Sequence, residues 1–296
     1  MPRSVLIVGG TSVDTIIHLD QFPSPTAQTI WPHASYRALG STGAGKALNL
    51  AALGESVTLH TLLGEDDEAR FVREQLAHEH IHLLTTITPE PTEQHVNLMD
   101  SHGDRISFFV QPPPEPTEVN WDGVRVAMDH CDVVVINILA YTRPVLAMAR
   151  AAGKPVWIDL HDYDGQDPYH QAFIEAADVL FLSSDRLPDY RPVMESFIEM
   201  GKSFVVCTHG RDGATLLDRN GQWLEQLVFD VETVVDTNGA GDAFFSGFLY
   251  GYSRDASLAD CLKLAAACGA LCVGSGTLAS PQLTASRLYE TAGLHP

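Results

Sequence analysis

The chain of 296 residues has few basic side chains and no long apolar run. It contains 18 Lys and Arg against 38 Asp and Glu, which gives a formal net charge of -20 at pH 7. No segment approaches the run of about 18 apolar residues that a membrane-spanning helix needs. An acidic chain without a basic cluster repels nucleic acid and anionic membrane surfaces. Both kinds of partner are therefore excluded from the expected function.

Cysteine is also scarce, and its spacing gives no sign of a metal site. The five cysteines are an odd number, and no pair has the C-x-x-C spacing of zinc sites. The thirteen histidines likewise show no H-E-x-x-H pattern. A secretory signal is not expected, because the apolar run 5–8 is short and ends at two glycines. These features favour buried free thiols and a reducing, cytoplasmic location.

What the chain does contain is an alternation of short apolar runs with amphipathic stretches. The runs that predict buried strands are 5–8, 133–136, 156–158, 179–182 and 204–206. Helices are expected near 44–53, 66–80, 121–129, 143–151, 169–176 and 191–200, and, after a hairpin-like stretch at 214–228, near 240–252 and 257–273. Strands that alternate with helices indicate a mostly parallel sheet covered on both faces.

Two regions, 13–38 and 93–111, break this pattern. They alternate polar and apolar residues and carry turn residues such as Pro23 and Gly103. We expect them to form short strands of a small lid-like sheet outside the main one. The proline-rich run 112–116 then leads back to the core as a stiff connector. The whole chain, 1–296, is expected to form one domain that includes this lid.

The segment 236–244, Asp-Thr-Asn-Gly-Ala-Gly-Asp-Ala-Phe, carries the clearest chemical signal. It follows the strand-like residues 231–235 and opens an apolar helix. Gly239 and Gly241 allow a sharp turn, and the free amides of the helix start form an anion site without basic side chains. Asp242 lies at the same place, where a carboxylate is unfavourable unless it accepts a proton from a reacting hydroxyl. The alternative is a glycine turn in which Asp242 only caps the helix.

This segment resembles the D-T-x-G-A-G-D signature of the ribokinase family, the PfkB-type carbohydrate kinases. The resemblance spans most of the chain and implies a three-layer α/β/α sandwich with a mostly parallel central sheet and a small β-sheet lid. It also implies an ATP-dependent kinase that moves the γ-phosphate to a hydroxyl of a sugar-like substrate. Asp242 would be the general base, and the amides of Gly239, Ala240 and Gly241 would form the anion hole.

The family resemblance also indicates residues at the nucleotide. The stretch 205–213 is similar to the V-T-x-G-x-x-G stretch that contacts ATP phosphates. The small-residue run 265–270 is similar to the helix beside the adenine, although close helix packing explains such residues equally well. The residues assigned in this way to the nucleotide are Thr208, Gly210, Gly213, Asn238 and Cys268.

The segment 40–47, Gly-Ser-Thr-Gly-Ala-Gly-Lys-Ala, matches the family's substrate loop, G-G-x-x-x-N-x-A, only in part. Gly45 stands where the family has an asparagine that binds a sugar hydroxyl, and Lys46 or Asn49 is a candidate substitute. Lys46 could also attract an acidic substrate or the transferred phosphate, and the alternative is a solvated lysine at a helix start. The predicted substrate-binding residues are Asp14, Gly40, Ser41, Thr42, Gly43, Gly45, Lys46 and Asn49.

The same segment nearly spells a P-loop, G-x-x-x-x-G-K-[ST]. Ala47 lacks the hydroxyl with which a P-loop holds Mg²⁺. A P-loop nucleoside triphosphatase is therefore a weaker alternative, in which Lys46 and not Asp242 is essential. Two further alternatives stay open, a nucleoside kinase of the same fold and a non-catalytic sugar or nucleotide sensor.

Magnesium is expected because it accompanies ATP. The family's N-x-x-E motif near the phosphates is replaced here by Ser-Ser-Asp-Arg at 183–186, where Asp185 is the candidate for some of that charge. Asp236 and Asn238 occupy positions that in some relatives help to bind a monovalent cation, so potassium is a further candidate. Lid strands in this family often pair between subunits, which predicts a homodimer.

Overall fold

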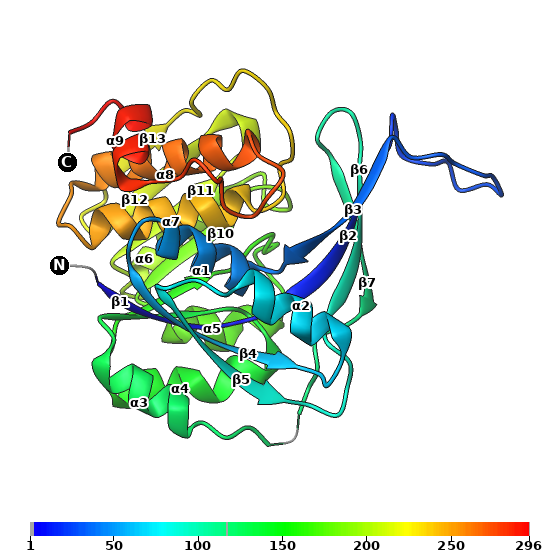
Figure 1. Ribbon diagram of the computed structural model, residues 1–296. Coiled ribbons are helices and arrows are strands. Elements are labelled where there is room, and N and C mark those ends of the chain that lie inside the picture. The colour runs from blue at the N-terminus through cyan, green and yellow to red at the C-terminus, as the bar shows by residue number, and fades with distance from the viewer. Residues whose placement is uncertain (1–2, 117, 296) are drawn as a thin grey trace.

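A nine-stranded sheet forms the centre of the computed structural model, which describes residues 3–116 and 118–295. Its strands are β1 (Ser4–Val8), β4 (Ser56–Leu63), β5 (Ile81–Ile87), β8 (Val133–Ile136), β9 (Val156–Asp159), β10 (Val179–Ser183), β11 (Phe204–Thr208), β12 (Ala214–Asp218) and β13 (Trp223–Gln226). They lie in the order β13-β12-β11-β10-β9-β8-β1-β4-β5 (Figure 1). The strands from β11 to β5 are parallel, and β12 and β13 extend the sheet as an antiparallel hairpin.

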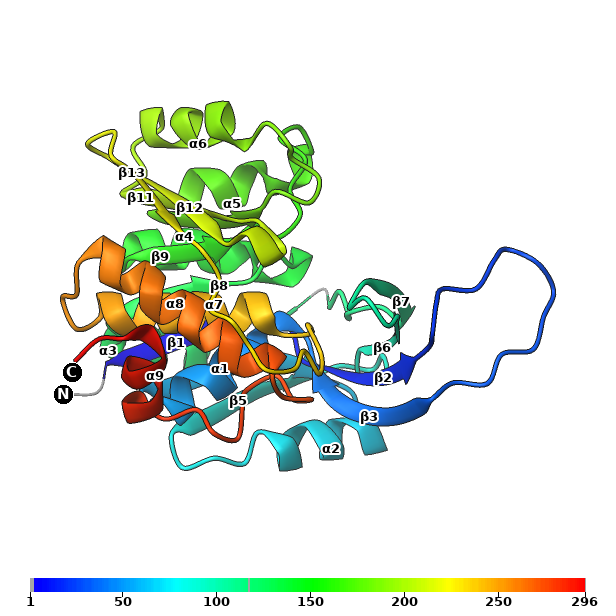
Figure 2. The ribbon, with the colours of Figure 1, turned by 90° about the horizontal axis from the view of Figure 1, so that it is seen from above.

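Helices cover both faces of this sheet (Figure 2). One layer contains α1 (Thr42–Ala52), α2 (Asp67–Gln75), α7 (Ala240–Tyr252) and α8 (Leu258–Val273), with α9 (Ala285–Ala292) packed on α8. The other contains α3 (Asp122–His130), α4 (Arg143–Ala151), α5 (Gln171–Ala176) and α6 (Tyr190–Glu199). Successive residues of a strand point to opposite faces of the sheet, so Ile7 packs in the core beneath the first helical layer and Leu6 in the core beneath the second. The predicted α/β/α sandwich with its mostly parallel sheet is confirmed.

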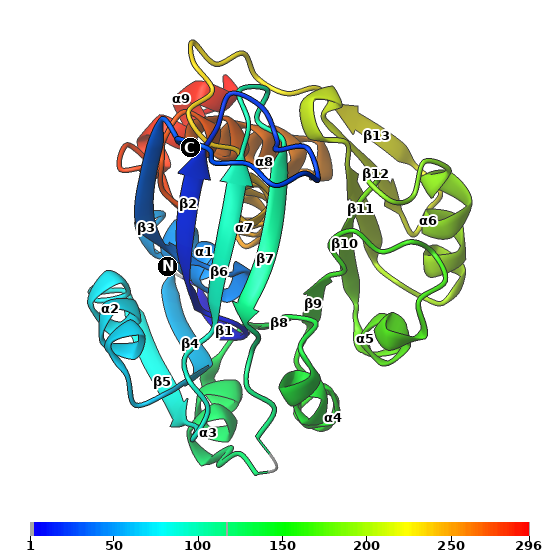
Figure 3. The same cartoon turned by 90° about the vertical axis from the view of Figure 1, so that its right-hand side faces the viewer.

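A second sheet of four strands stands at the edge where the parallel strands end (Figure 3). Its strands are β2 (Ser12–His18), β3 (Ala34–Gly40), β6 (Gln94–Met99) and β7 (Arg105–Gln111), in the order β3-β2-β6-β7. This is the small sheet predicted from 13–38 and 93–111. Between β2 and β3, a finger of residues 19–33 projects far from the body, and Trp31 on it is 88% exposed (Figure 2).

Some elements differ from the sequence-based prediction. β4, β5 and α9 were not expected, and the helix predicted at 66–80 ends at Gln75. β4 and β5 carry Thr and His among their apolar residues, so they lack the continuous apolar run of the other central strands. The predicted strand 231–235 is wrong, because this segment is irregular and bonds to a helix end, with the Val235 amide donating to the carbonyl of Val273.

All five cysteines are buried free thiols, as expected. Burial raises the pKa of both Cys207 and Cys261 to about 12, so these thiols stay protonated at neutral pH. Across residues 3–116 and 118–295, none of the helices combines the length and apolar character required to span a bilayer.

Candidate active site

The glycine-rich segment 40–45 passes between two buried carboxylates at the lid edge of the main sheet. β3 ends at Gly40 and α1 begins at Thr42. A Cβ atom on Gly40 would lie 2.1 Å from Oδ1 of Asp14, and one on Gly45 would lie 2.6 Å from Oδ2 of Asp242. Both positions therefore require glycine, because the two acidic side chains pack directly against the backbone. The structure thus brings Asp14 and Asp242, 228 residues apart in sequence, to the two ends of one short segment.

Asp14 lies in a network of buried polar side chains from β2 and β6. Its carboxylate accepts hydrogen bonds from the Ser12 hydroxyl at 2.6 Å and the Asn97 amide at 2.8 Å. His95 lies between two carboxylates, with Nδ1 3.3 Å from Asp14 and Nε2 2.8 Å from Glu93. Burial alone would raise the pKa of Asp14, but the bonds from His95 and Ser12 outweigh it and lower that pKa. Asp14 is thus held as a carboxylate.

His95 itself is held in the charged form by this network. Burial would lower its pKa, but the hydrogen bonds to Asp14 and Glu93 outweigh that effect and raise the pKa to about 9. Sequence reasoning missed Glu93, His95 and Asn97. The alternation of β6 could have shown that His95 and Asn97 share one face, but their position beside Asp14 depends on the pairing of β2 with β6.

Asp242 lies in the first turn of α7 and is 8% exposed. Its Oδ1 is 2.5 Å from Nζ of Lys46, and the same ammonium group lies 3.1 Å from Oδ2 of Asp159 at the end of β9. Burial raises the pKa of Asp242, an effect that Lys46 opposes. The interpretation of Lys46 as a solvated lysine is wrong, because its side chain is completely buried.

The segment 40–47 does not have the form of a phosphate-binding P-loop. Residues from Thr42 onward are already helical, and the Lys46 ammonium is bonded to two carboxylates.

Asn49 is buried one turn further on, and its side-chain amide donates to the carbonyl oxygens of Gly45 and Leu278, both at 2.8 Å. Asn49 therefore ties the end of the glycine-rich segment to the loop that follows α8.

The start of α7 has the geometry expected of an anion-binding turn. Gly239 precedes the helix with φ 81°, a conformation that favours glycine. Apart from its chain neighbours and the backbone of its own helix, no described atom lies within 4 Å of the point where a Cβ would stand on Gly241, so the turn is open on that side. The Ala240 amide makes a 3.3 Å bond to the Thr237 carbonyl, while first-turn amides in general lack partners inside their helix.

The lid contacts the loop that leads into this turn. The Tyr36 hydroxyl of β3 donates to Asp236 at 3.3 Å, and Arg105 of β7 donates to Oδ1 of Asn238 at 2.6 Å. The Thr237 hydroxyl donates to the carbonyl of Gly103 in the β6–β7 turn at 3.0 Å. These three contacts join the lid to residues 236–238.

The residues predicted at the nucleotide lie in two places. Thr208 ends β11, and Gly210 and Gly213 follow it with φ of 55° and 94° in the turn before β12. Cys268 is buried where α8 packs on α7, with its Cβ 2.7 Å from the point where a Cβ would stand on Gly247. Close helix packing therefore explains Cys268, whereas the 208–213 turn lies at the same sheet edge as Asp159.

Asp185 follows β10 and accepts a hydrogen bond from the Ser183 hydroxyl at 3.1 Å. Asp236 is buried, and it accepts hydrogen bonds from the Tyr36 hydroxyl and, at 2.8 Å, from the backbone amide of Asn238. In the part of the chain that the structure describes, no group of three His, Cys, Asp or Glu side chains is placed to hold a metal ion. Asp185 and Asp236, the two predicted metal ligands, are therefore not part of such a group.

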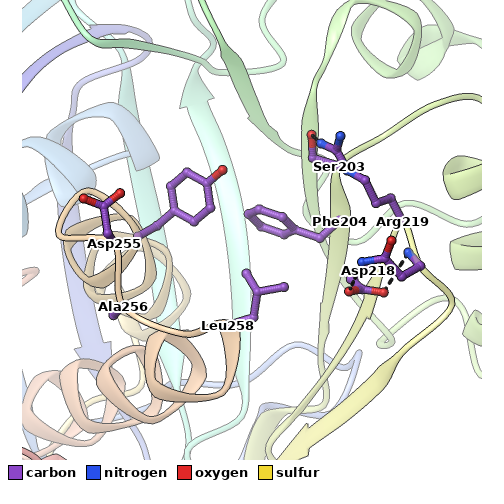
Figure 4. Close-up of a pocket in the computed structure, with 9 residues that line it drawn as sticks. Ser203, Phe204, Asp218, Arg219, Asp255, Ala256 and Leu258 are labelled. Atoms are coloured by element: carbon purple, nitrogen blue, oxygen red, sulfur yellow. Dashed lines mark hydrogen bonds between the residues drawn. The ribbon is translucent and has the colours of Figure 1, made fainter.

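A cavity of about 390 Å³ lies elsewhere, near the amino end of β11 (Figure 4). Its lining includes Ser203, Phe204, Asp218, Arg219, Asp255 and Leu258. Because Phe204 begins β11, this cavity lies at the amino edge of the parallel strands, whereas Asp242 lies at the carboxyl edge, where such sheets bind their ligands. It is not part of the candidate site.

Comparison with known proteins identifies relatives over most of the chain. The chain is 31% identical to the acarbose 7(IV)-phosphotransferase of Actinoplanes sp. over 282 residues, which is 90% of each chain. It is 28% identical to the nucleoside kinase of Methanothermobacter thermautotrophicus over 90% of this chain and 87% of that one.

Among solved structures, a microbiome-derived acarbose kinase matches with a TM-score of 0.87 and 28% identity, covering 99% of this chain and 100% of that one. The Arabidopsis thaliana ribokinase complexed with ribose and ATP shares the fold, with a TM-score of 0.81 at 21% identity over all of both chains. The model of the pfkB family carbohydrate kinases matches residues 3–285. The chain therefore belongs to the pfkB family of carbohydrate kinases, as the 236–244 segment predicted.

Proposed function

We propose that this kinase uses magnesium-bound ATP to phosphorylate a hydroxyl of a sugar-like substrate, with Asp242 as the general base. The observation that carries the proposal is the position of Asp14 and Asp242 at opposite ends of the 40–45 segment, with the start of α7 beside Asp242. A substrate over this segment can meet a hydroxyl-binding carboxylate at one end and a proton acceptor at the other. The relatives named as acarbose, ribose and nucleoside kinases support this class of reaction.

The reaction is a direct in-line transfer. Asp242 takes the proton of the attacking hydroxyl, the new O–P bond forms, and the bond between the γ-phosphorus and the leaving oxygen of ADP breaks. The amides of Gly239, Ala240 and Gly241 stabilise the charge on the transferring group, and losing one such donor costs on the order of 3 kcal/mol in the transition state. Burial suits Asp242 to this task, because it raises the pKa of the base toward the working pH.

The polar residues of the lid indicate how the substrate is held. Within residues 3–116 and 118–295, the buried Oδ1 atoms of Asn97 and Asn137 have no hydrogen-bond partner. Asn97 is bonded to Asp14 through its amide nitrogen, so its free oxygen adds an acceptor beside that carboxylate. Acceptors of this kind suit the O–H donors of a polyhydroxylated substrate. The 40–45 backbone, with Ser41 and Thr42, would complete this subsite.

ATP would bind across the 208–213 turn toward α8, with magnesium arriving as part of the nucleotide substrate. Asp185 is the nearest candidate to influence that magnesium from β10. The two oxygens of Asp236 accept bonds from Tyr36 and from the backbone amide of Asn238, and no step is assigned to potassium.

The proposal is tested by measuring ADP release with purified enzyme across pentoses, hexoses, sugar acids, oligosaccharides and nucleosides. Asp242→Asn should lower turnover on the accepted substrate by roughly 10²–10⁴ in a protein that remains folded at the assay temperature. Asp162→Asn is the matched control, since it removes an exposed carboxylate of the loop after β9, at the same edge. Full turnover by Asp242→Asn would exclude Asp242 as the base.

The same assay separates the alternatives. The similarity to the nucleoside kinase of Methanothermobacter thermautotrophicus supports the nucleoside kinase alternative. That alternative predicts turnover with nucleosides and none with free sugars. A sensor would bind sugar or nucleotide in calorimetry without forming ADP.

A further inference from the structure

Among residues 3–116 and 118–295, Lys46 is the one lysine with a completely buried side chain, and it lies between the carboxylates of Asp242 and Asp159. Its Nζ contacts Oδ1 of Asp242 at 2.5 Å and Oδ2 of Asp159 at 3.1 Å. A buried ammonium ion is costly unless paired charges surround it, and here two carboxylates do so. Burial lowers the pKa of Lys46, but Asp242 and Asp159 outweigh it and raise that pKa, so the side chain stays charged.

The environment of Lys46 leaves little room for a substrate contact. An ammonium group has three donors, and two of them are directed at carboxylates. The group also lies 4.9 Å from the centre of the Phe245 ring on α7, which adds a cation–π contact. Lys46 therefore acts inside the protein, between α1, β9 and α7.

Gly45 explains how this contact fits into the fold. Any Cβ at position 45 would lie 2.6 Å from Oδ2 and 2.9 Å from Cβ of Asp242. Gly45, which stands where the family has an asparagine, is thus structurally linked to Lys46, since glycine at 45 makes the space in which Asp242 meets the following lysine.

We propose that Lys46 is a positioning residue of the phosphoryl-transfer site, whose ammonium group fixes the Asp242 carboxylate in place and keeps it ionised, while Asp159 anchors Lys46 from β9. This role rests on the proposed function of Asp242 as the base. Lys46 keeps its own proton throughout, and the proton of the substrate hydroxyl goes to Asp242.

The charges around Asp242 predict how its titration changes. Lys46 faces it from α1, Asp159 from β9, His161 from the loop after β9, and Cys272 from α8. Lys46 and His161 favour the ionised form of Asp242, whereas Asp159 opposes it. Loss of Lys46 must therefore raise the pKa of Asp242, and loss of the Asp159 charge must lower it.

The test compares Lys46→Met, which keeps an apolar stem of similar length, with Asp159→Asn. Steady-state kinetics across pH 5–9 should show that Lys46→Met moves the acid limb of kcat to higher pH by about one unit or more. Its kcat at neutral pH should fall by roughly 10-fold or more, while the KM for the acceptor changes little. Asp159→Asn should move the acid limb in the opposite direction, and Lys46→Arg should restore it toward the wild type.

Three results would overturn the proposal. One is a raised acceptor KM in Lys46→Met with unchanged kcat and an unmoved acid limb, which is the signature of a substrate contact. The second is displacement of the limb in the same direction by Lys46→Met and Asp159→Asn. The third is an unmoved limb in Asp159→Asn, and this variant decides the matter alone if Lys46→Met does not fold, because Asp159 is partly exposed.

A separate result tests the proposed role of Asp242 itself. Full activity of the Asp242→Asn variant would show that Asp242 is not the base, regardless of the results for the Lys46 variants. If Asp242→Asn is inactive, adding Lys46→Met to it should cause little further loss, because Lys46 acts through that carboxylate. A large additional loss in the double variant would show that Lys46 has an independent role.

Discussion

At the scale of single residues, the two carboxylates of the site differ in their electrostatic environment. Asp14 has hydrogen-bond donors on both oxygens, and these hold its pKa below the usual value despite burial. Asp242 is also buried, and burial raises its pKa. Oppositely shifted carboxylates are typical of sites in which one group binds and the other exchanges a proton. This difference suits Asp14 to substrate hydroxyls and Asp242 to proton transfer.

His95 predicts a pH dependence of stability. Its pKa is about 9 in the folded protein, above the ordinary value of 6.5. A raised pKa contributes stability that is fully present below pH 6.5 and is lost as the pH rises through about 9. We expect the free energy of unfolding of the wild type to fall over this window by more than that of His95→Gln. Urea unfolding at pH 6 and pH 9.5 measures the difference, and parallel losses in both proteins would contradict it.

The sequence predicts these residues unequally. Asp242 and its glycines lie in one continuous segment, so the resemblance of that segment to the family signature selected them. Lys46 was selected too, but its burial depends on Asp159, 113 residues away, and a lysine alone does not reveal its partners. His95 and Asn97 are side chains of the ordinary-looking strand β6, which Glu93 precedes, and only the pairing of β6 with β2 places them beside Asp14.

At the scale of elements, the lid is joined to residues 236–238, just before α7, by hydrogen bonds from Tyr36, Thr237 and Arg105. Closure of such a lid excludes water from the transferring phosphoryl group. These hydrogen bonds therefore link the closure of the lid over a substrate to the loop of residues 236–238.

Arg105→Ala should weaken lid closure by about 1 kcal/mol, or roughly fivefold, because it removes one hydrogen bond to Asn238. The expected result is a higher acceptor KM and more ADP formed per phosphorylated product, since water reaches the site more often. Parallel assays of ADP and of product give the ratio. Arg37→Ala is the control, because Arg37 bonds to Glu68 on α2 instead. An unchanged ratio in Arg105→Ala would show that this contact does not couple the lid to the site.

The sequence-based prediction of strands succeeded where every residue of the strand is apolar. The central strands 133–136 and 179–182 are apolar throughout and were found, whereas β4 and β5 mix Thr and His into the same sheet. The valine-rich segment 231–235 has a strand-like composition, but no neighbouring strand pairs with it, and tertiary contact with α8 decides its conformation.

At the scale of the whole molecule, β7 is an edge strand with exposed apolar side chains. Ile106, Phe108 and Val110 alternate along one face of it and are 39%, 51% and 59% exposed. An uncovered apolar edge is an association site, so we propose that two copies of the chain pair through their lids.

Phe108→Lys should therefore convert a homodimer into a monomer, since it places a charge in the centre of this strip. Light scattering coupled to size-exclusion chromatography measures the mass, and Val126→Lys on α3 is the control for an exposed apolar side chain outside the lid. A wild-type protein that is monomeric at all concentrations would contradict the pairing.

The burial of every cysteine has a practical consequence for following lid movement. Thiols that are buried and protonated react slowly with maleimide reagents. A cysteine introduced in place of the exposed Trp31 would then be the preferred labelling position without removal of any native thiol. A fluorophore attached there would sit on the finger close to the start of β3, where it can report movement of the lid in real time.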